Sequence, residues 1–223
     1  MNIKGAIFDM DGTLVDSLMY WDHLWRTVGR TFLGDEHFRP SEEDDKAVRT
    51  MLFRDAMEMI RVKYCFPLPK DGLWEFAVQD EERFYREDVF PKSGARELLE
   101  HLKAENVRMC VASATDRKYL PIALEHCGLE GYFEFLLSCE ELGVGKDRPD
   151  VYHLALRRLG LEPQEVCVFE DSYVALETAG SIGCHTAGIY DKYNFGQERL
   201  LAASELYVGM GESLEVLIPK VGG

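Results

Sequence analysis

The chain has 223 residues, of which 46% are hydrophobic and 29% charged, as is typical of soluble globular proteins. This length allows one large domain, or a core domain with a smaller one inserted. With 40 acidic and 25 basic side chains the formal net charge is −15, which repels nucleic acid phosphates and anionic lipids. We therefore expect neither nucleic acid nor a membrane as a partner.

The cysteines and the apolar runs indicate the compartment. The 6 cysteines include no Cys-x-x-Cys pair and no accompanying histidine cluster, so a zinc site is not expected. Cys110 and Cys167 lie within apolar runs, which favours buried thiols. No signal-peptide region opens the sequence, and no run is long enough to cross a bilayer. We expect a cytoplasmic protein, and since nothing demands an oligomer, a monomer or at most a dimer.

The first part of the chain predicts one strand followed by helices. Residues 3–8 form an apolar run typical of a short buried strand, and Asp11-Gly12 is a turn signal at its end. Asp16-Ser17 offers a helix N-cap before a stripe of apolar residues that runs to residue 32. Further helical stripes follow, and no strand signal appears between residues 16 and 89. We predict that residues 16–89 form an all-helical cap domain inserted into the core.

The second part alternates between strands and helices. Strands are predicted at 107–112, 135–138, 166–169 and 185–189, with a candidate edge strand at 206–208. The helices between them are predicted at 95–102, 122–126, 150–159 and 174–182. Such alternation implies right-handed crossovers and a parallel sheet covered on both faces. The predicted fold class is α/β, with residues 1–15 and 90–223 forming a doubly wound, Rossmann-like core.

Polar residues follow the predicted strands, at the sheet edge where ligands bind in such folds. Two aspartates, Asp9 and Asp11, follow the first strand. The other polar or small residues at these positions are Gly12, Thr13, Ser113, Ala114, Thr115, Lys146, Glu170 and Asp171. The types are complementary, since carboxylates, a lysine and potential phosphate-binding groups are expected to meet at one edge.

These residue types fit phosphoryl transfer. A carboxylate can attack a phosphoryl group and split its hydrolysis into two steps, and Asp9, last on its strand, is the natural nucleophile. Asp11 could serve as general acid and base, a role worth about 10²–10⁴-fold. Ser113 and the following backbone N–H groups at Ala114 would bind the phosphate, as would the turn at Gly12 and Thr13.

The same cluster requires a cation. Asp9, Asp11, Glu170 and Asp171 carry a charge of −4 when ionised, against +1 on Lys146, and would repel a phosphate dianion. Mg²⁺ prefers oxygen ligands. We expect it to bind Asp9, Asp171 and the turn at Asp11, with Glu170 contributing and Asp171 favoured over Glu170 as the direct ligand.

The segment from Asp9 to Ser17, of sequence DMDGTLVDS, resembles the first motif of the haloacid dehalogenase superfamily. Ser113 after a strand, Lys146 with a downstream Pro149-Asp150, and the segment VFEDS ending at Ser172 resemble its other three motifs. The inserted cap is similar to that of the branch containing β-phosphoglucomutase and sugar-phosphate phosphatases. The resemblance implies Asp9 as nucleophile and Asp11 as general acid and base. It also implies Ser113 and Lys146 at the phosphate, Glu170 and Asp171 at a Mg²⁺ cofactor, and a small phosphorylated metabolite as substrate. Two positions depart from the pattern, namely Asp147-Arg148 and Ala175.

Three functions remain open. A phosphatase with a phospho-Asp9 intermediate is preferred, because dehalogenases and phosphonate hydrolases of the superfamily lack an acid at the position of Asp11. A phosphomutase is less favoured, since its Val-Ser-Arg cap segment is matched poorly by Val48-Arg49-Thr50. A non-enzymatic binding protein would have lost one of the site residues. In the cap, Arg49, Thr50 and Arg54 are either candidate specificity residues or part of a solvated helix face. The helical spacing of the cap aromatics favours a place in the core for Trp21, Trp25, Trp74 and Tyr85.

Overall fold

The structure, a computed structural model, describes residues 1–48, 51 and 53–222. Two of the predicted specificity candidates, Arg49 and Thr50, therefore lie outside the described residues. The chain divides into a core unit, Met1–Leu18 with Val89–Gly223, and a helical unit, Met19–Asp88. Among the described residues, no helix is long and apolar enough to cross a membrane.

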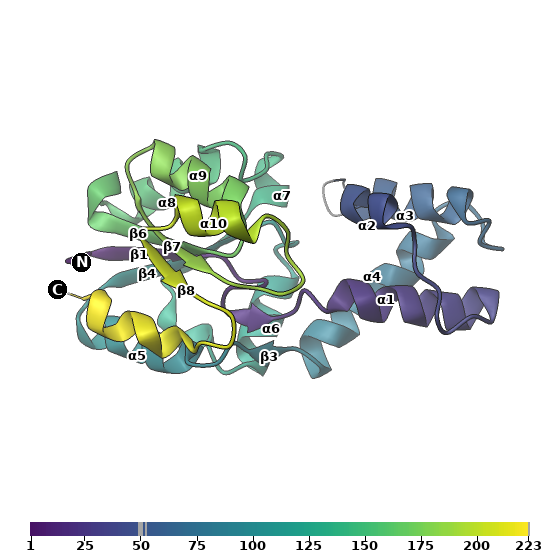
Figure 1. Cartoon of the computed structure of the whole chain (residues 1–223), viewed down its shortest axis with the longest axis horizontal. Coiled ribbons are helices and arrows are strands. Elements are labelled where there is room, and N and C mark those ends of the chain that lie inside the picture. The colour runs from purple at the N-terminus through teal and green to yellow at the C-terminus, as the bar shows by residue number, and fades with distance from the viewer. Residues whose placement is uncertain (49–50, 52, 223) are drawn as a thin grey trace. The chain divides into compact units, whose positions relative to one another are not determined.

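A six-stranded sheet forms the centre of the core unit (Figure 1), with strand order β5-β4-β1-β6-β7-β8. Every neighbouring pair is parallel. The strands are β1 (Gly5–Phe8), β4 (Arg108–Ser113), β5 (Phe135–Ser138), β6 (Val166–Glu170), β7 (His185–Ile189) and β8 (Leu206–Val208). The predicted parallel α/β fold is confirmed, including the edge strand at 206–208.

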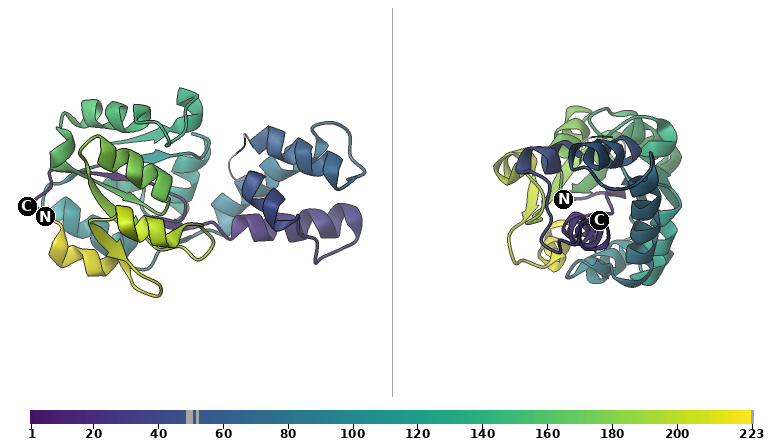
Figure 2. Two further views of the ribbon diagram at one scale, coloured as in Figure 1. Left: turned by 45° about the horizontal axis from the view of Figure 1, so that its top comes forward. Right: turned by 90° about the vertical axis from the view of Figure 1, so that its right-hand side faces the viewer.

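Helices cover both faces of this sheet, as Figure 1 shows. On one face lie α5 (Ala95–Ala104) and α6 (Tyr119–His126), and on the other α8 (Asp150–Leu159), α9 (Tyr173–Ser181) and α10 (Gln197–Ala203). The last two pack side by side, which Figure 2 shows from two further directions. Short helical turns complete the unit: α7 (Cys139–Leu142), η2 (Glu130–Tyr132), η3 (Pro163–Glu165) and η4 (Leu214–Lys220).

The core between the sheet and α8 is apolar and closely packed. Ile7 on β1 and Val168 on β6 face Ala155 and Leu159 of α8 within one buried cluster. Fully burying one such aliphatic side chain stabilises the fold by about 1.5–3 kcal/mol. Cys110 belongs to this cluster, Cys167 is also buried, and all six cysteines are free thiols, as predicted for the two buried ones.

The helical unit consists of α1 (Tyr20–Val28), a π-helical turn η1 (Gly29–Leu33), α2 (Glu42–Val48), α3 (Phe53–Lys63) and α4 (Gly72–Glu87). Its aromatic residues are largely internal. Trp25 and Tyr85 are buried, and Trp21 and Trp74 are half-buried. The indole N–H of Trp25 donates to Asp45 at 2.7 Å. These contacts agree with the core role that helical spacing favoured.

Two local expectations were wrong. The strands β2 (Val15–Asp16) and β3 (Phe90–Pro91) pair antiparallel at the two ends of the insert, although no strand was predicted there. Two-residue strands are too short to show a period, and Phe90 is exposed. Ser17 is not a helix cap: α1 begins after Met19 without a side-chain cap, and the Ser17 hydroxyl donates to Asp11 at 2.6 Å.

A polar network within the helical unit centres on the buried carboxylate of Asp44. Lys63 donates to it at 2.6 Å, Tyr64 at 2.5 Å and Ser41 at 2.8 Å. Together these hydrogen bonds, with that of Lys63 the largest cause, lower the pKa of Asp44 from 3.8 to about 2. A carboxyl whose pKa is lower in the folded chain stabilises folding above its unfolded pKa, and this stabilisation is lost as the pH falls through the folded value.

We therefore expect Asp44→Asn to unfold at a lower temperature than the wild type at pH 7. The difference between the two unfolding temperatures should narrow as the pH falls from about 4 to about 2, where the wild-type carboxyl becomes protonated. Thermal unfolding followed by circular dichroism across this pH range measures the effect. Glu43→Gln, at an exposed neighbouring position, is the control and should show no such narrowing. A gap independent of pH would contradict the assignment.

Candidate active site

The centre of the site is a buried lysine between two carboxylates. Asp9 directly follows β1 and Glu170 ends the neighbouring β6, so the parallel pairing sets them side by side. Lys146, from the loop before α8, donates one hydrogen bond to Asp9 Oδ1 and another, of 2.5 Å, to Glu170 Oε1. Burial would lower the pKa of Lys146, but the two carboxylates outweigh it and raise that pKa well above its usual value. Lys146 is therefore positively charged.

A third carboxylate completes a possible metal site. One oxygen each of Asp9, Glu170 and Asp171 lies within 4.8 Å of the others, and all three residues are buried. Burial, followed by the repulsion of neighbouring carboxylates, raises the pKa of Asp171 well above its usual value. Burial likewise raises the pKa of Asp9 to about 8, although Lys146 opposes the shift. A divalent cation would relieve this repulsion.

The free oxygen atoms of the cluster fit an oxygen-liganded cation such as Mg²⁺. Both oxygens of Glu170 are engaged, by Lys146 and by the backbone N–H of Ser172 at 2.9 Å. In Asp171 only Oδ2 is engaged, by Asn194 at 2.7 Å. Oδ1 accepts no hydrogen bond from the residues that the structure describes. Asp171 therefore has a side-chain oxygen left for a cation and Glu170 has none, and the role of either residue as a direct ligand stays a prediction.

Asp11 accepts hydrogen bonds from two hydroxyl groups. Ser17 donates to its Oδ1 at 2.6 Å and Thr115 to its Oδ2 at 2.6 Å. A carboxylate that accepts from both sides has a fixed orientation. Thr115 was noted only as a residue that follows a strand and was given no role, and Asn194 was not predicted as a site residue, because each contact joins positions far apart in the sequence and neither has a motif of its own.

The predicted phosphate-binding residues are placed in two groups. Ser113 ends β4, next to β1, and its buried hydroxyl oxygen accepts the N–H of Thr115 at 3.1 Å, while Ala114 between them is exposed. In the turn after Asp9, the N–H groups of Gly12 and Thr13 already donate, to Val15 at 2.9 Å and to Met10 at 3.3 Å. The phosphate-binding role of Gly12 and Thr13 has no contact in its favour and stays a prediction.

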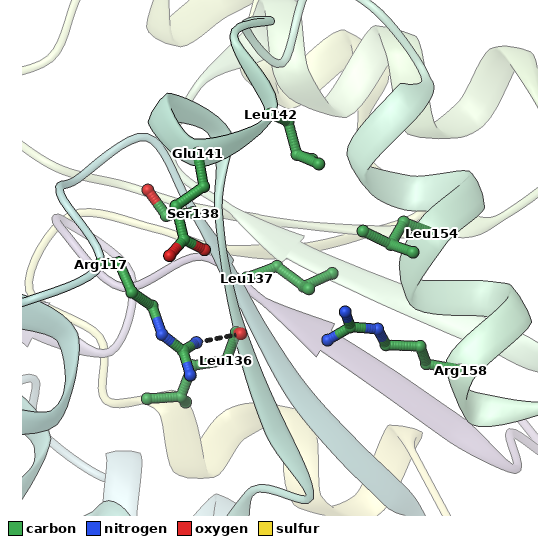
Figure 3. A pocket seen from close by; sticks show the side chains of 8 residues that line it. All are labelled: Arg117, Leu136, Leu137, Ser138, Glu141, Leu142, Leu154 and Arg158. Atoms are coloured by element: carbon green, nitrogen blue, oxygen red, sulfur yellow. Dashed lines mark hydrogen bonds between the residues drawn. The ribbon is translucent and has the colours of Figure 1, made fainter.

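A cavity of about 190 Å³ in the core unit lies elsewhere, beside the edge strand β5 (Figure 3). Its wall includes Leu136, Leu137 and two arginines, and none of the predicted site residues. Arg117 donates to the carbonyl of Leu136, and Arg158 lies over the ring of Phe135 at 5.5 Å. The cavity is thus a crevice along a covered strand edge, separate from the carboxylate cluster.

Comparison with known proteins identifies the family. The profile of the haloacid dehalogenase-like hydrolases matches residues 3–183. The chain belongs to this hydrolase family. It is similar to a phosphorylated carbohydrates phosphatase of Thermotoga maritima, with 29% identity over 96% of this chain and 98% of the relative. Hexitol phosphatase A of Escherichia coli is 27% identical over 85% of this chain and 84% of its own.

Solved structures of this hydrolase family have the same fold. A Thermotoga maritima protein described as a candidate β-phosphoglucomutase superposes with a TM-score of 0.80 and 26% identity, over 96% of this chain and 98% of its own. CbbY of Rhodobacter sphaeroides, solved with phosphate, gives a TM-score of 0.75 at 21% identity over 92% of this chain and 93% of its own. The second likeness shows the fold alone. The predicted superfamily and its hydrolase class are confirmed.

Gly12 makes room for the Asp171 carboxylate. Its φ is +79°, and a Cβ atom there would lie 2.3 Å from Asp171 Oδ2. Gly211 has a similar φ of +76° but open space around the Cβ position, so it serves as a matched control.

We expect Gly211→Ala to lower the free energy of unfolding by about 1–2 kcal/mol, the cost of a left-handed conformation alone. Gly12→Ala should cost a further ~1–3 kcal/mol, because Asp171 or the turn must move. Urea titration of both variants measures the difference. Equal losses of unfolding free energy in the two variants would show that a Cβ atom at position 12 does not press on Asp171.

Proposed function

We propose that this hydrolase is a Mg²⁺-dependent phosphatase of a small phosphorylated carbohydrate, acting through a phospho-aspartate on Asp9. The observation that carries the proposal is the buried Asp9–Lys146–Glu170 arrangement, with one oxygen each of Asp9, Glu170 and Asp171 within 4.8 Å of the others. A nucleophilic carboxylate, a fixed positive charge and an oxygen available to a cation are the groups that transfer of a phosphoryl group to a carboxylate requires.

The reaction follows from the roles of the two aspartates. An oxygen of Asp9 forms a bond to phosphorus as the ester P–O bond breaks, and Asp11 gives its proton to the leaving alcohol oxygen. Asp11, now a carboxylate, takes a proton from a water molecule that attacks the phosphorus. The bond between phosphorus and Asp9 breaks, which releases inorganic phosphate and restores both aspartates.

The other residues of the site manage charge and position. Lys146 balances the negative charge of the phosphoryl oxygens and holds Asp9. The Ser113 hydroxyl and the backbone N–H at Ala114 donate hydrogen bonds to the phosphoryl oxygens. Mg²⁺, held by Asp9, Asp171 and the backbone at Asp11 with Glu170 alongside, would neutralise charge on the phosphoryl group. Ser17 and Thr115 orient Asp11.

The substrate class is suggested by relatives named for phosphorylated carbohydrates and hexitol phosphates. We assign specificity to the helical unit, Met19–Asp88, which corresponds to the cap domain predicted at residues 16–89. Arg54 loses support as a free specificity residue, because it forms a bidentate pair with Asp71 at 2.7 and 3.0 Å and lies over the Trp74 ring at 4.7 Å. The specificity residues therefore remain to be mapped on other positions of that unit.

Replacing the nucleophile should abolish turnover. We expect Asp9→Asn to lower phosphate release from p-nitrophenyl phosphate with Mg²⁺ by about 10⁴-fold or more, since residues that act as a catalytic unit carry effects of this size. Asp35→Asn, an exposed change in the helical unit, should retain the wild-type rate. Full activity of Asp9→Asn would refute the mechanism.

Removing the metal should have a parallel effect. Treatment with EDTA should stop phosphate release, and added Mg²⁺ should restore it. Mg²⁺ should also raise the Tm of the wild type but not of Asp171→Asn, because binding to the folded state alone stabilises it. Activity that persists in EDTA would contradict metal dependence.

A phosphomutase is the second candidate, favoured by the solved neighbour described as a β-phosphoglucomutase. The two functions differ in the acceptor of the phosphoryl group, which is water in one and a sugar hydroxyl in the other. A coupled assay for glucose 6-phosphate formed from β-glucose 1-phosphate separates them. Glucose 6-phosphate formed without release of inorganic phosphate would replace the phosphatase proposal with the mutase.

A further inference from the structure

The loop after β7 reaches the carboxylate cluster through one amide side chain. Asn194 Nδ2 donates to Asp171 Oδ2 at 2.7 Å and to the Asp171 carbonyl at 3.1 Å. Its Oδ1 accepts the backbone N–H of Phe195 at 2.8 Å. Because the oxygen already has this donor, the amide can present only its NH₂ group to Asp171. The orientation of Asn194 is therefore defined by its contacts on both sides.

These contacts leave one particular oxygen of Asp171 available. Oδ2 is occupied by Asn194 on one side and approached closely by Gly12 on the other. Oδ1 accepts no hydrogen bond from any residue in the described part of the chain. The amide thus decides which carboxylate oxygen is left for a cation.

The loop that carries Asn194 is anchored by a buried ion pair. Lys92 Nζ donates to Asp191 Oδ2 at 2.5 Å, and the Asp191 side chain has an exposed fraction of 0%. The other side-chain oxygen of Asp191, Oδ1, accepts the backbone N–H of Tyr193 at 2.8 Å. The backbone carbonyl of Asp191 accepts from the Gln197 side-chain amide at 2.9 Å. Removing one partner of a buried pair leaves an uncompensated charge, so this anchor is strongly held.

Lys92 itself is fixed to the turn that follows the first aspartates. Its backbone N–H donates to the carbonyl of Leu14 at 2.9 Å, and its Nζ lies 3.7 Å from Asp16 Oδ1. A continuous chain of contacts therefore runs from the Asp11–Val15 turn through Lys92 and Asp191 to Asn194 and Asp171.

We propose that Asn194 is a positioning residue for Asp171 as a metal ligand, and that the Lys92–Asp191 pair holds Asn194 in place. The proposal rests on the proposed function only in taking Asp171 as a ligand. Partners of this kind typically contribute 10–100-fold to metal affinity or activity. The effect acts on the metal, so it can be measured without substrate.

The test is Mn²⁺ binding to the metal-free full chain, followed by electron paramagnetic resonance or calorimetry. We expect Asn194→Ala to weaken Mn²⁺ binding about tenfold. Asn194→Ser, which keeps a short hydroxyl donor, should recover part of the affinity, and Asp191→Asn should weaken binding in the same direction as Asn194→Ala. Lys192→Ala, an exposed change in the same loop, should leave the affinity unchanged.

The outcomes separate this inference from the proposed function. Wild-type protein that binds Mn²⁺ and releases phosphate, together with Asn194→Ala of unchanged Mn²⁺ affinity, overturns the inference alone. Wild-type protein that binds no Mn²⁺ overturns the proposed metal dependence and the inference with it. Circular dichroism checks folding, and if Asn194→Ala is unfolded, wild-type affinity in both Asn194→Ser and Asp191→Asn overturns the inference.

Discussion

Three buried carboxylates beside one buried ammonium group are the constraint on which the site depends. Each buried ion costs several kcal/mol in lost hydration unless partners offset it. Lys146 can balance only part of the charge of Asp9, Glu170 and Asp171, so burial and then the repulsion of neighbouring carboxylates raise the pKa values of Asp9 and Asp171. A cluster of this kind is costly to fold, and binding of the proposed cation and phosphoryl group would offset that cost.

The strand order explains how distant motifs reach one point. β1 lies between β4 and β6, so the residues after Phe8 emerge beside Ser113 on one side and Glu170 on the other. The chain leaves β5 at one edge and must cross β4 and β1 to enter β6. That crossover begins with the loop holding Lys146, which therefore contacts the ends of both β1 and β6.

The fold was predictable because it rests on local patterns, and the positions of the candidate site residues at the strand ends followed from it. The contacts of Lys146 with Asp9 and Glu170, 137 and 24 positions away, were not predicted. The apolar runs predicted the bounds of the strands to within one or two residues. The strand predicted at 107–112, for example, is observed at Arg108–Ser113. The same approach could not find Thr115 on Asp11 or Asn194 on Asp171, since these pairs lie 104 and 23 positions apart with no periodic signal. Ser17 was assigned to a cap because its type suits one, and only the folded turn shows that its hydroxyl donates to Asp11. Short strands such as β2 and β3 likewise lack a pattern.

The β2–β3 ribbon has a consequence for how such proteins diversify. Asp16 pairs with Phe90 and Val15 with Pro91, so the two ends of the helical insert are fixed next to each other by the core unit itself. The β2–β3 pairing therefore meets the entropic cost of bringing the two ends of the insert together. This cost changes little with the length of the insert. An inserted segment of another size or sequence can be exchanged at this ribbon while the chemistry at Asp9 is retained. Recognition and reaction can then evolve as separate modules within one polypeptide.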